Sequence, residues 1–160
     1  MTYKQLMFKR ILFTTLAGVM ILFIFIISSL DADASTVHST GVREFVNSLL
    51  KSLNIPIVFS EFFVRKCAHF AEYFVLGTLL FYAVKSYFLK LDARMILSPS
   101  FGLVVASIDE TIQFFTEGRS AQFTDVLLDL SAVITAFLIF FIISFKIDKR
   151  KGRKEEIYNE

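Results

Sequence analysis

The 160-residue sequence contains one cysteine, two prolines and no tryptophan. The single cysteine, Cys67, has no partner within the chain, which excludes an intramolecular disulfide framework. Pro56 ends any helical run that precedes the second apolar segment, and Pro99 is expected to kink the third. The formal net charge is only +2, which is too small to indicate a nucleic-acid partner. We find no internal repeat and no low-complexity segment.

Long uncharged runs dominate the sequence, which is 55% hydrophobic and has a mean hydropathy of +0.62. A helix that crosses the hydrocarbon core of a bilayer needs about 20 mostly apolar residues. The sequence therefore predicts an all-α polytopic membrane protein, with a four-helix membrane domain over residues 11–145, a short N-terminus at 1–10 and a basic tail at 146–160. The predicted spans are residues 11–30, 62–84, 94–115 and 123–145.

Lysine and arginine are distributed unevenly along the chain. They gather in the N-terminus, in the loop at 85–94 and in the tail, whereas the connections at 31–60 and 116–122 contain few of them. Loops rich in Lys and Arg stay on the cytoplasmic side of a membrane. We therefore predict a multi-pass protein of the plasma membrane with both termini in the cytoplasm.

The first apolar segment also has features of a secretory signal peptide. A basic start precedes the apolar core, and Ala32, Asp33 and Ala34 have the A-x-A form of a cleavage site. Signal cores run to about 7–15 residues, which is shorter than this segment. We favour an uncleaved anchor, and the other three spans are predicted with either alternative.

The connection between the first two spans is expected to begin with a polar connector at residues 31–38. An amphipathic helix over 41–53 follows, with Ser39 or Thr40 near its start. This helix is too short to cross the bilayer, so we expect it to lie on the outer membrane surface or to cap the bundle. Its apolar face consists of Val42, Phe45, Val46, Leu49, Leu50 and Leu53.

Ionisable residues interrupt three of the four spans, and in each span they fall on one helix face. Their deepest members, Glu72, Asp109 and Asp129, lie about 9–10 Å along the helix axis from the outer ends of their spans. An ionisable group that faces lipid costs at least about 2.5–3.5 kcal/mol. We therefore predict that the three polar faces meet in the interior of the bundle. They consist of Arg65, Lys66, His69, Glu72 and Tyr73; of Asp109, Glu110, Gln113, Thr116 and Glu117; and of Asp125 and Asp129.

The predicted cluster contains more acids than bases. Six carboxyl groups stand against three fixed bases, Arg65, Lys66 and Arg119, so full ionisation would leave a net negative charge in a low dielectric. Three explanations stay open: some carboxyls are protonated, His69 is charged, or a cation is bound. Carboxyl groups held near neutrality can act as acids or bases.

We predict two sets of site residues. The candidate catalytic residues, which would transfer protons, are His69, Glu72, Asp109 and Glu110. The candidate residues for binding an anionic substrate are Arg65, Lys66, Gln113, Arg119, Asp125 and Asp129. Structural alternatives exist: Lys66 could reach the lipid head groups, Asp125 could cap the last span, and the whole cluster could hold the helices together.

No metal site and no cofactor are assigned from the sequence. Histidine with several carboxylates can hold zinc, manganese or magnesium. His69 and Glu72 have the i, i+3 spacing of di-metal helix bundles, but the second histidine of that pattern is missing.

Two segments, RKCAHFAEYFVLG at 65–77 and DETIQFFTEGRSAQFTDVLLD at 109–129, resemble the signature of the VanZ-like family. The resemblance implies a small bacterial membrane protein associated with reduced susceptibility to glycopeptide antibiotics, chiefly teicoplanin. Family members often carry Asn where this chain has Asp129. The positions to which the resemblance attaches importance are Arg65, Lys66, His69, Glu72, Asp109, Glu110, Gln113, Gly118, Arg119 and Asp125.

Our leading interpretation is a cell-envelope protein of the lipid bilayer that binds or modifies an anionic lipid or a lipid-linked envelope precursor at the outer leaflet. The alternative is a non-enzymatic element of ion- or proton-coupled transport, or an accessory membrane subunit. Transport sites usually lie near the midplane of the bilayer and between internal repeats. The predicted cluster is off-centre and the chain has no repeat, so we favour the first interpretation.

Overall fold

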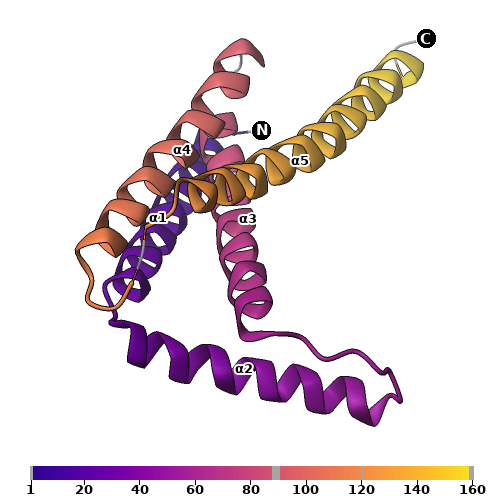
Figure 1. Ribbon diagram of the computed structural model, residues 1–160. Helices are drawn as coiled ribbons and strands as arrows, with labels where there is room; N and C mark the ends of the chain where they lie inside the picture. The colour runs from indigo at the N-terminus through magenta and orange to yellow at the C-terminus, as the bar shows by residue number, and fades with distance from the viewer. Residues whose placement is uncertain (1, 88–90, 120, 159–160) are drawn as a thin grey trace.

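The computed structural model describes residues 2–87, 91–119 and 121–158, with the side chains of 32–39, 148 and 151–158 left out of the description. This part of the chain is all-α, which confirms the predicted fold class (Figure 1). The helices are α1 (Tyr3–Ser28), α2 (Ala32–Ser52), α3 (Glu61–Tyr87), α4 (Leu91–Phe115) and α5 (Phe123–Tyr158).

Four helices are long and apolar enough to cross a membrane: α1, α3, α4 and the part of α5 at Phe123–Ile147. The four predicted spans are therefore confirmed. α1 begins earlier than predicted, because Thr2 and Gln5 form a capping box at its start. α4 contains Pro99 and continues on both sides of it. α5 continues beyond the predicted span into the basic tail, as far as Tyr158.

The predicted polar connector at residues 31–38 is wrong, because α2 is already helical from Ala32. Asp31 directly precedes the first helical residue, where an aspartate can accept from free backbone N–H groups. No proline or glycine interrupts residues 32–40. Residues 31–38 have no apolar face, so hydrophobic periodicity does not predict a helix there. A helix can form without such a face.

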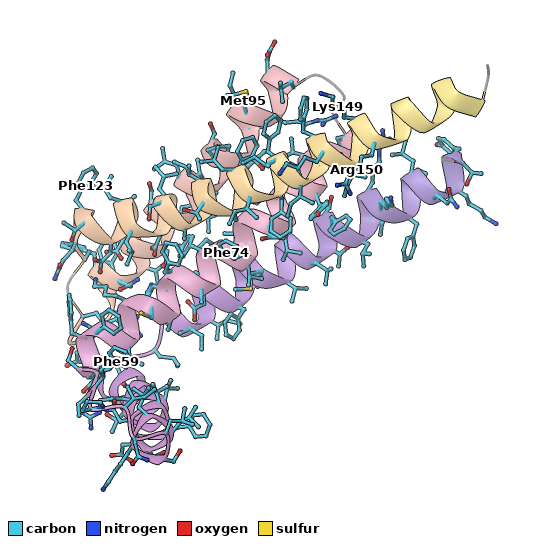
Figure 2. All side chains as sticks on the ribbon, turned by 90° about the vertical axis from the view of Figure 1, so that its right-hand side faces the viewer. Phe59, Phe74, Met95, Phe123, Lys149 and Arg150 are labelled. Carbon is cyan, nitrogen blue, oxygen red and sulfur yellow. The ribbon has the colours of Figure 1, made fainter. Side chains whose placement is uncertain are left out.

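The spanning helices run antiparallel along the chain, and hydrogen bonds mark which ends meet. The start of α1 meets the end of α3, since Arg10 Nε donates to the Ser86 carbonyl oxygen at 2.9 Å. The ends of α1 and α4 also meet, because Thr116 Oγ1 donates to the Ser28 carbonyl oxygen at 3.2 Å. Figure 1 shows α2 lying across this second end of the bundle, which we call the α2 end. In Figure 2, Phe59 lies near this end, far from Lys149.

α3 is the central helix, because it packs against α1, α4 and α5. Glycines allow α5 to approach closely. A Cβ atom added at Gly77 would lie 2.8 Å from the Val133 Cα atom, and one at Gly102 would lie 2.7 Å from a Val133 side-chain carbon. α3 and α4 therefore both press on the same short stretch of α5, which fixes the distance between their polar faces.

The linker between α2 and α3 is attached to α2 by one side chain. Asn47 Oδ1 accepts from the Phe59 backbone N–H at 2.9 Å, and Asn47 Nδ2 donates to the Phe59 carbonyl oxygen at 3.2 Å. Asn54 has a φ of 56°, a left-handed conformation that asparagine tolerates at a helix end. These contacts hold α2 beside the start of α3.

Candidate functional site

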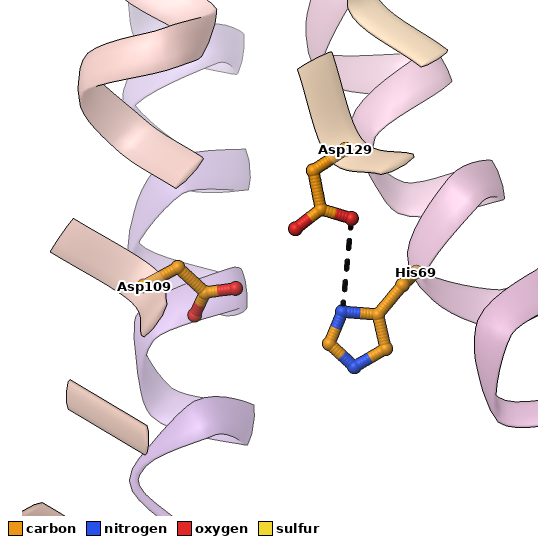
Figure 3. A group of neighbouring side chains, drawn as sticks. All are labelled: His69, Asp109 and Asp129. Atoms are coloured by element: carbon orange, nitrogen blue, oxygen red, sulfur yellow. Dashed lines mark ion pairs between the residues drawn. The ribbon is translucent and has the colours of Figure 1, made fainter. Parts of the chain in front are cut away.

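His69, Asp109 and Asp129 come from three different helices and meet inside the bundle near the α2 end. One ligand-type atom of each residue lies within 4.8 Å of the corresponding atoms of the other two. Figure 3 shows the two carboxyl groups and the imidazole ring directed toward one another. We call this group of three the carboxylate–histidine centre. The three polar faces predicted from the sequence thus meet through one residue each: His69 of α3, Asp109 of α4 and Asp129 of α5.

The centre has hydrogen-bond donors for only one of its four carboxylate oxygens. Asp109 Oδ2 accepts from Tyr73 Oη at 3.1 Å and from Gln113 Nε2 at 3.3 Å. Asp109 Oδ1 and both carboxylate oxygens of Asp129 are buried and have no hydrogen-bond partner among the described residues. The nearest histidine nitrogen, His69 Nδ1, is 4.0 Å from Asp129 Oδ1, which is beyond hydrogen-bond distance.

Both aspartates are completely buried, with an exposed fraction of 0%. A buried carboxylate without a donor is unfavourable by several kcal/mol if it is ionised. Such a group persists where it is protonated or where a cation neutralises it. The two buried carboxyl groups of the centre therefore need either bound protons or a nearby positive charge.

Three other predicted site residues make contacts at the margin of the centre. Glu110 is buried, and its Oε2 accepts from the Gln122 backbone N–H at 2.9 Å, which ties α4 to the start of α5. Lys66 Nζ pairs with Asp125 Oδ1 between α3 and α5. Both contacts hold the ends of helices together. Lys66 and Asp125 neutralise each other, whereas Glu110 Oε1 is buried and has no hydrogen-bond partner among the described residues.

A cavity of about 240 Å³ adjoins the centre on the side of α1 and α3. Two arginines, Arg65 and Arg119, line it together with His69 and Glu72, so His69 belongs to both the cavity and the centre. The rest of the wall is apolar. It consists of Phe23 and Ile27 of α1, Leu30 just after α1, Val42 of α2, and Val64 and Ala68 of α3.

Arg119 lies in the loop between α4 and α5 and is half-buried. One of its terminal nitrogens donates to the Ile27 carbonyl oxygen at 3.2 Å, at the negative end of the α1 dipole. A guanidinium has five N–H donors, so this contact uses only part of its capacity. Burial lowers the pKa of Arg119 from its usual value, and the positive charge of Arg65 also lowers it, while Asp109, Glu110 and Glu72 raise it.

A larger groove of about 710 Å³ lies between α2 and the linker at 54–59. None of the ten predicted site residues lines this groove. Its polar wall comes from α2 residues such as Asn47 and Lys51. Its size alone therefore does not connect it with the buried charges.

Sequence reasoning grouped the polar residues but missed how they divide. It did not separate a cavity side, with Arg65, Arg119 and Glu72, from the centre, with Asp109 and Asp129. It placed Tyr73 on a polar face without a partner, and the structure shows that the Tyr73 hydroxyl donates to Asp109. The apolar cavity wall from α1 was also missed. No periodicity within one helix signals it, because α1 is apolar on every face.

The comparisons agree with this architecture and with the resemblance noted in the sequence. The model of the VanZ/LLP1 family matches residues 13–144, which include all four spans, the centre and the cavity. No curated protein and no solved structure gives a significant match. The chain is a multi-pass membrane protein that belongs to the VanZ/LLP1 family.

Proposed function

We propose that this protein binds an anionic, lipid-linked molecule of the cell envelope in the cavity between α1 and α3, with the anionic group between Arg65 and Arg119. The α2 end would face outward, as the distribution of Lys and Arg predicts. Through this molecule the protein would contribute to glycopeptide susceptibility, the trait that the family resemblance suggests.

The observation that carries the proposal is the composition of the cavity wall. Two guanidinium groups line one cavity whose other walls are mostly apolar. Arg65 is exposed and Arg119 is half-buried, and the two guanidinium groups repel each other across the cavity. An anion between them would remove that repulsion. Guanidinium groups form charge-assisted hydrogen bonds to phosphate and carboxylate oxygens. An anion that carries a lipid chain satisfies the arginines and the apolar wall together.

The position of the cavity supports a lipid-linked ligand over a free one. Its α1 wall includes Phe23, whose side chain is 46% exposed and faces the bilayer side of the helix. Val42 adds part of the apolar face of α2 to the same wall. That face also exposes Phe45 and Leu49, as expected of a helix lying at a membrane surface. A lipid could therefore enter sideways, from the outer leaflet.

His69 and Glu72 line the same cavity and are the groups placed to move a proton on the bound molecule. They lie on adjacent turns of α3, and His69 reaches the carboxylate–histidine centre behind the cavity. A proton taken up by His69 would be stabilised by the buried carboxylates beside it. The proposal therefore assigns binding to the arginines and proton transfer to His69 and Glu72.

Binding can be tested with purified protein in nanodiscs and a polyprenyl phosphate as probe. We expect saturable binding that weakens at least tenfold in the double variant Arg65→Gln/Arg119→Gln, because each lost charge-assisted hydrogen bond contributes about 1.5–3 kcal/mol. The matched control is Arg43→Gln, since Arg43 lines the larger groove and pairs with Glu44 instead.

The nature of the ligand is tested in the same preparation by mass spectrometry of lipids that co-purify with the protein. Wild type should retain anionic lipids in preference to phosphatidylcholine added as a competitor, and the double variant should retain neither preferentially. Equal retention of polyprenyl phosphate by wild type and by the double variant would exclude the cavity as the binding site.

A further inference from the structure

We infer that the carboxylate–histidine centre is a binding site for one divalent metal cation, held by His69, Asp109 and Asp129. This site differs from the proposed lipid site, because Asp109 and Asp129 lie behind the cavity and only His69 is shared with the cavity wall. Three features of the centre support the inference: the unpartnered oxygen atoms, the spacing of the three side chains and the balance of charge.

The unpartnered atoms are concentrated in this one place. Among the described residues, five buried side-chain atoms lack a hydrogen-bond partner, and three of them are Asp109 Oδ1 and the two carboxylate oxygens of Asp129. Both side chains are fully buried, so water does not solvate them from outside. Native proteins rarely bury polar atoms without a partner, and an ion is one of the few explanations for such a group.

The spacing of the three side chains fits a metal ion. A cation bound at about 2.0–2.2 Å from each ligand places the ligand atoms roughly 3–4.4 Å from one another. The three atoms here lie within 4.8 Å of one another, and His69 Nδ1 is 4.0 Å from Asp129 Oδ1. Small rotations of the side chains bring them to bonding distance. Direct hydrogen bonds would need a closer approach, which this arrangement lacks.

The charge balance favours a divalent ion over a bound proton. Two ionised aspartates carry two negative charges, which one divalent cation cancels. A single proton could bridge Asp109 and Asp129, but it would cancel only one of these charges and leave the other buried. Lys66, the nearest lysine of the polar face, pairs with Asp125 and is engaged there. Tyr73 and Gln113, which donate to Asp109, would orient that carboxylate as supporting residues around a metal ligand.

The ligand set indicates which cations would bind. One imidazole nitrogen with two carboxylates suits manganese or zinc, whereas magnesium prefers oxygen ligands alone. Three protein ligands leave coordination positions open toward the cavity. His69 is partly exposed there, so the cation has a route of entry. The cation would also place positive charge next to the anionic group that the cavity is proposed to hold. With His69 bound to the cation, proton transfer on the bound molecule would fall to Glu72.

The test is a titration of chelator-treated protein in detergent with MnCl₂, followed by electron paramagnetic resonance of the bound ion. We expect one equivalent of Mn²⁺ per chain, displaced by ZnCl₂ and only weakly by MgCl₂. Asp109→Asn, Asp129→Asn and His69→Gln should each weaken binding at least tenfold. Glu117→Gln is the matched control, because Glu117 is an exposed carboxylate at the same end of the bundle.

Two readouts keep the test decisive if a variant folds poorly. Mn²⁺ should raise the thermal unfolding midpoint of wild type but not that of the three variants. In the Mn²⁺-loaded protein, Asp129 should be ionised. Infrared spectroscopy should therefore show the same protonated-carboxyl absorption in wild type and in Asp129→Asn, with no band that the substitution removes. Such a band, or binding that is equal in wild type and all three variants, would overturn the cation site. Arg65→Gln/Arg119→Gln should keep the cation, so failure of lipid binding and failure of this inference are separate results.

Discussion

The two halves of the helix bundle are held together by different means. In the half away from α2, aromatic rings pack edge to face, with Phe81 and Phe137 at 5.7 Å and Tyr82 and Phe140 at 5.5 Å between ring centroids. In the half near α2, buried carboxyl groups gather, and four of their oxygens lack a partner among the described residues. Aromatic packing stabilises the half away from α2, whereas the unpartnered carboxyl groups near α2 lower the free energy of unfolding.

This difference indicates where a small membrane protein can place a site. Buried polar groups without partners reduce the free energy of unfolding. The close packing of Gly77 and Gly102 on Val133 lies next to the centre and compensates for that cost. Substitutions in the two halves should therefore have opposite consequences: packing changes reduce abundance, and changes in the centre reduce activity while sparing the fold.

The largest loss of stability is expected for Gly77→Val. Its side chain would collide with the Val133 backbone, so α3 and α5 must separate, at a cost of about 1–3 kcal/mol or more. Gly18→Val is the matched control, because a Cβ atom at Gly18 meets nothing within 4 Å. The measurements are membrane abundance and the thermal midpoint in detergent. Equal midpoints for the two variants would contradict the packing account.

A smaller loss is expected for Lys66→Met, which leaves the partly buried Asp125 carboxylate without its partner. We expect about 1–2 kcal/mol, between the effect of an exposed pair and that of a fully buried one. Lys66→Met/Asp125→Asn should recover part of this loss, since the stranded charge is removed. Chemical denaturation of Lys66→Met, Asp125→Asn and the double variant measures the coupling between the two residues. Additive effects would show that the two residues do not interact.

No loss of stability is expected for His69→Ala and Asp129→Asn in metal-free protein, because neither substitution removes a hydrogen bond described in the structure. Both variants, and Glu110→Gln, should nevertheless lose the contribution to glycopeptide susceptibility. The measurement is antibiotic susceptibility beside membrane protein level, with Lys51→Ala as the control. Full activity in both His69→Ala and Glu110→Gln would leave a purely structural role for this half of the bundle.

No effect on the fold is expected from cysteines introduced to test orientation. In a Cys67→Ser background, Lys51→Cys should react with a membrane-impermeant thiol reagent applied to whole cells, and Lys149→Cys should react only after lysis. Both side chains are exposed, so accessibility does not limit the reaction. Labelling of Lys149→Cys in whole cells would invert the topology and place the site in the inner leaflet.

The sequence by itself determined the four spans, the all-α class and the three polar faces. Each depends on composition or periodicity within one helix, and these are local properties of the chain. It also predicted an amphipathic helix over 41–53, and the second half of α2, which ends at Ser52, lies there. It did not locate the start of α2, because the first turns lack an apolar face and helix formation there depends on propensity and capping.

Only the tertiary structure decided which polar residues meet. Each polar face offered several candidates, and the choice depends on how the helices are rotated and shifted along their axes. The contact of Gly77 and Gly102 with Val133 sets that arrangement. As a result, Asp129 joins His69 and Asp109 in the centre, while Glu110 turns to the Gln122 N–H and Glu72 turns to the cavity. A rotation of one helix by one residue would bring other side chains together, which is why periodicity alone could not separate them.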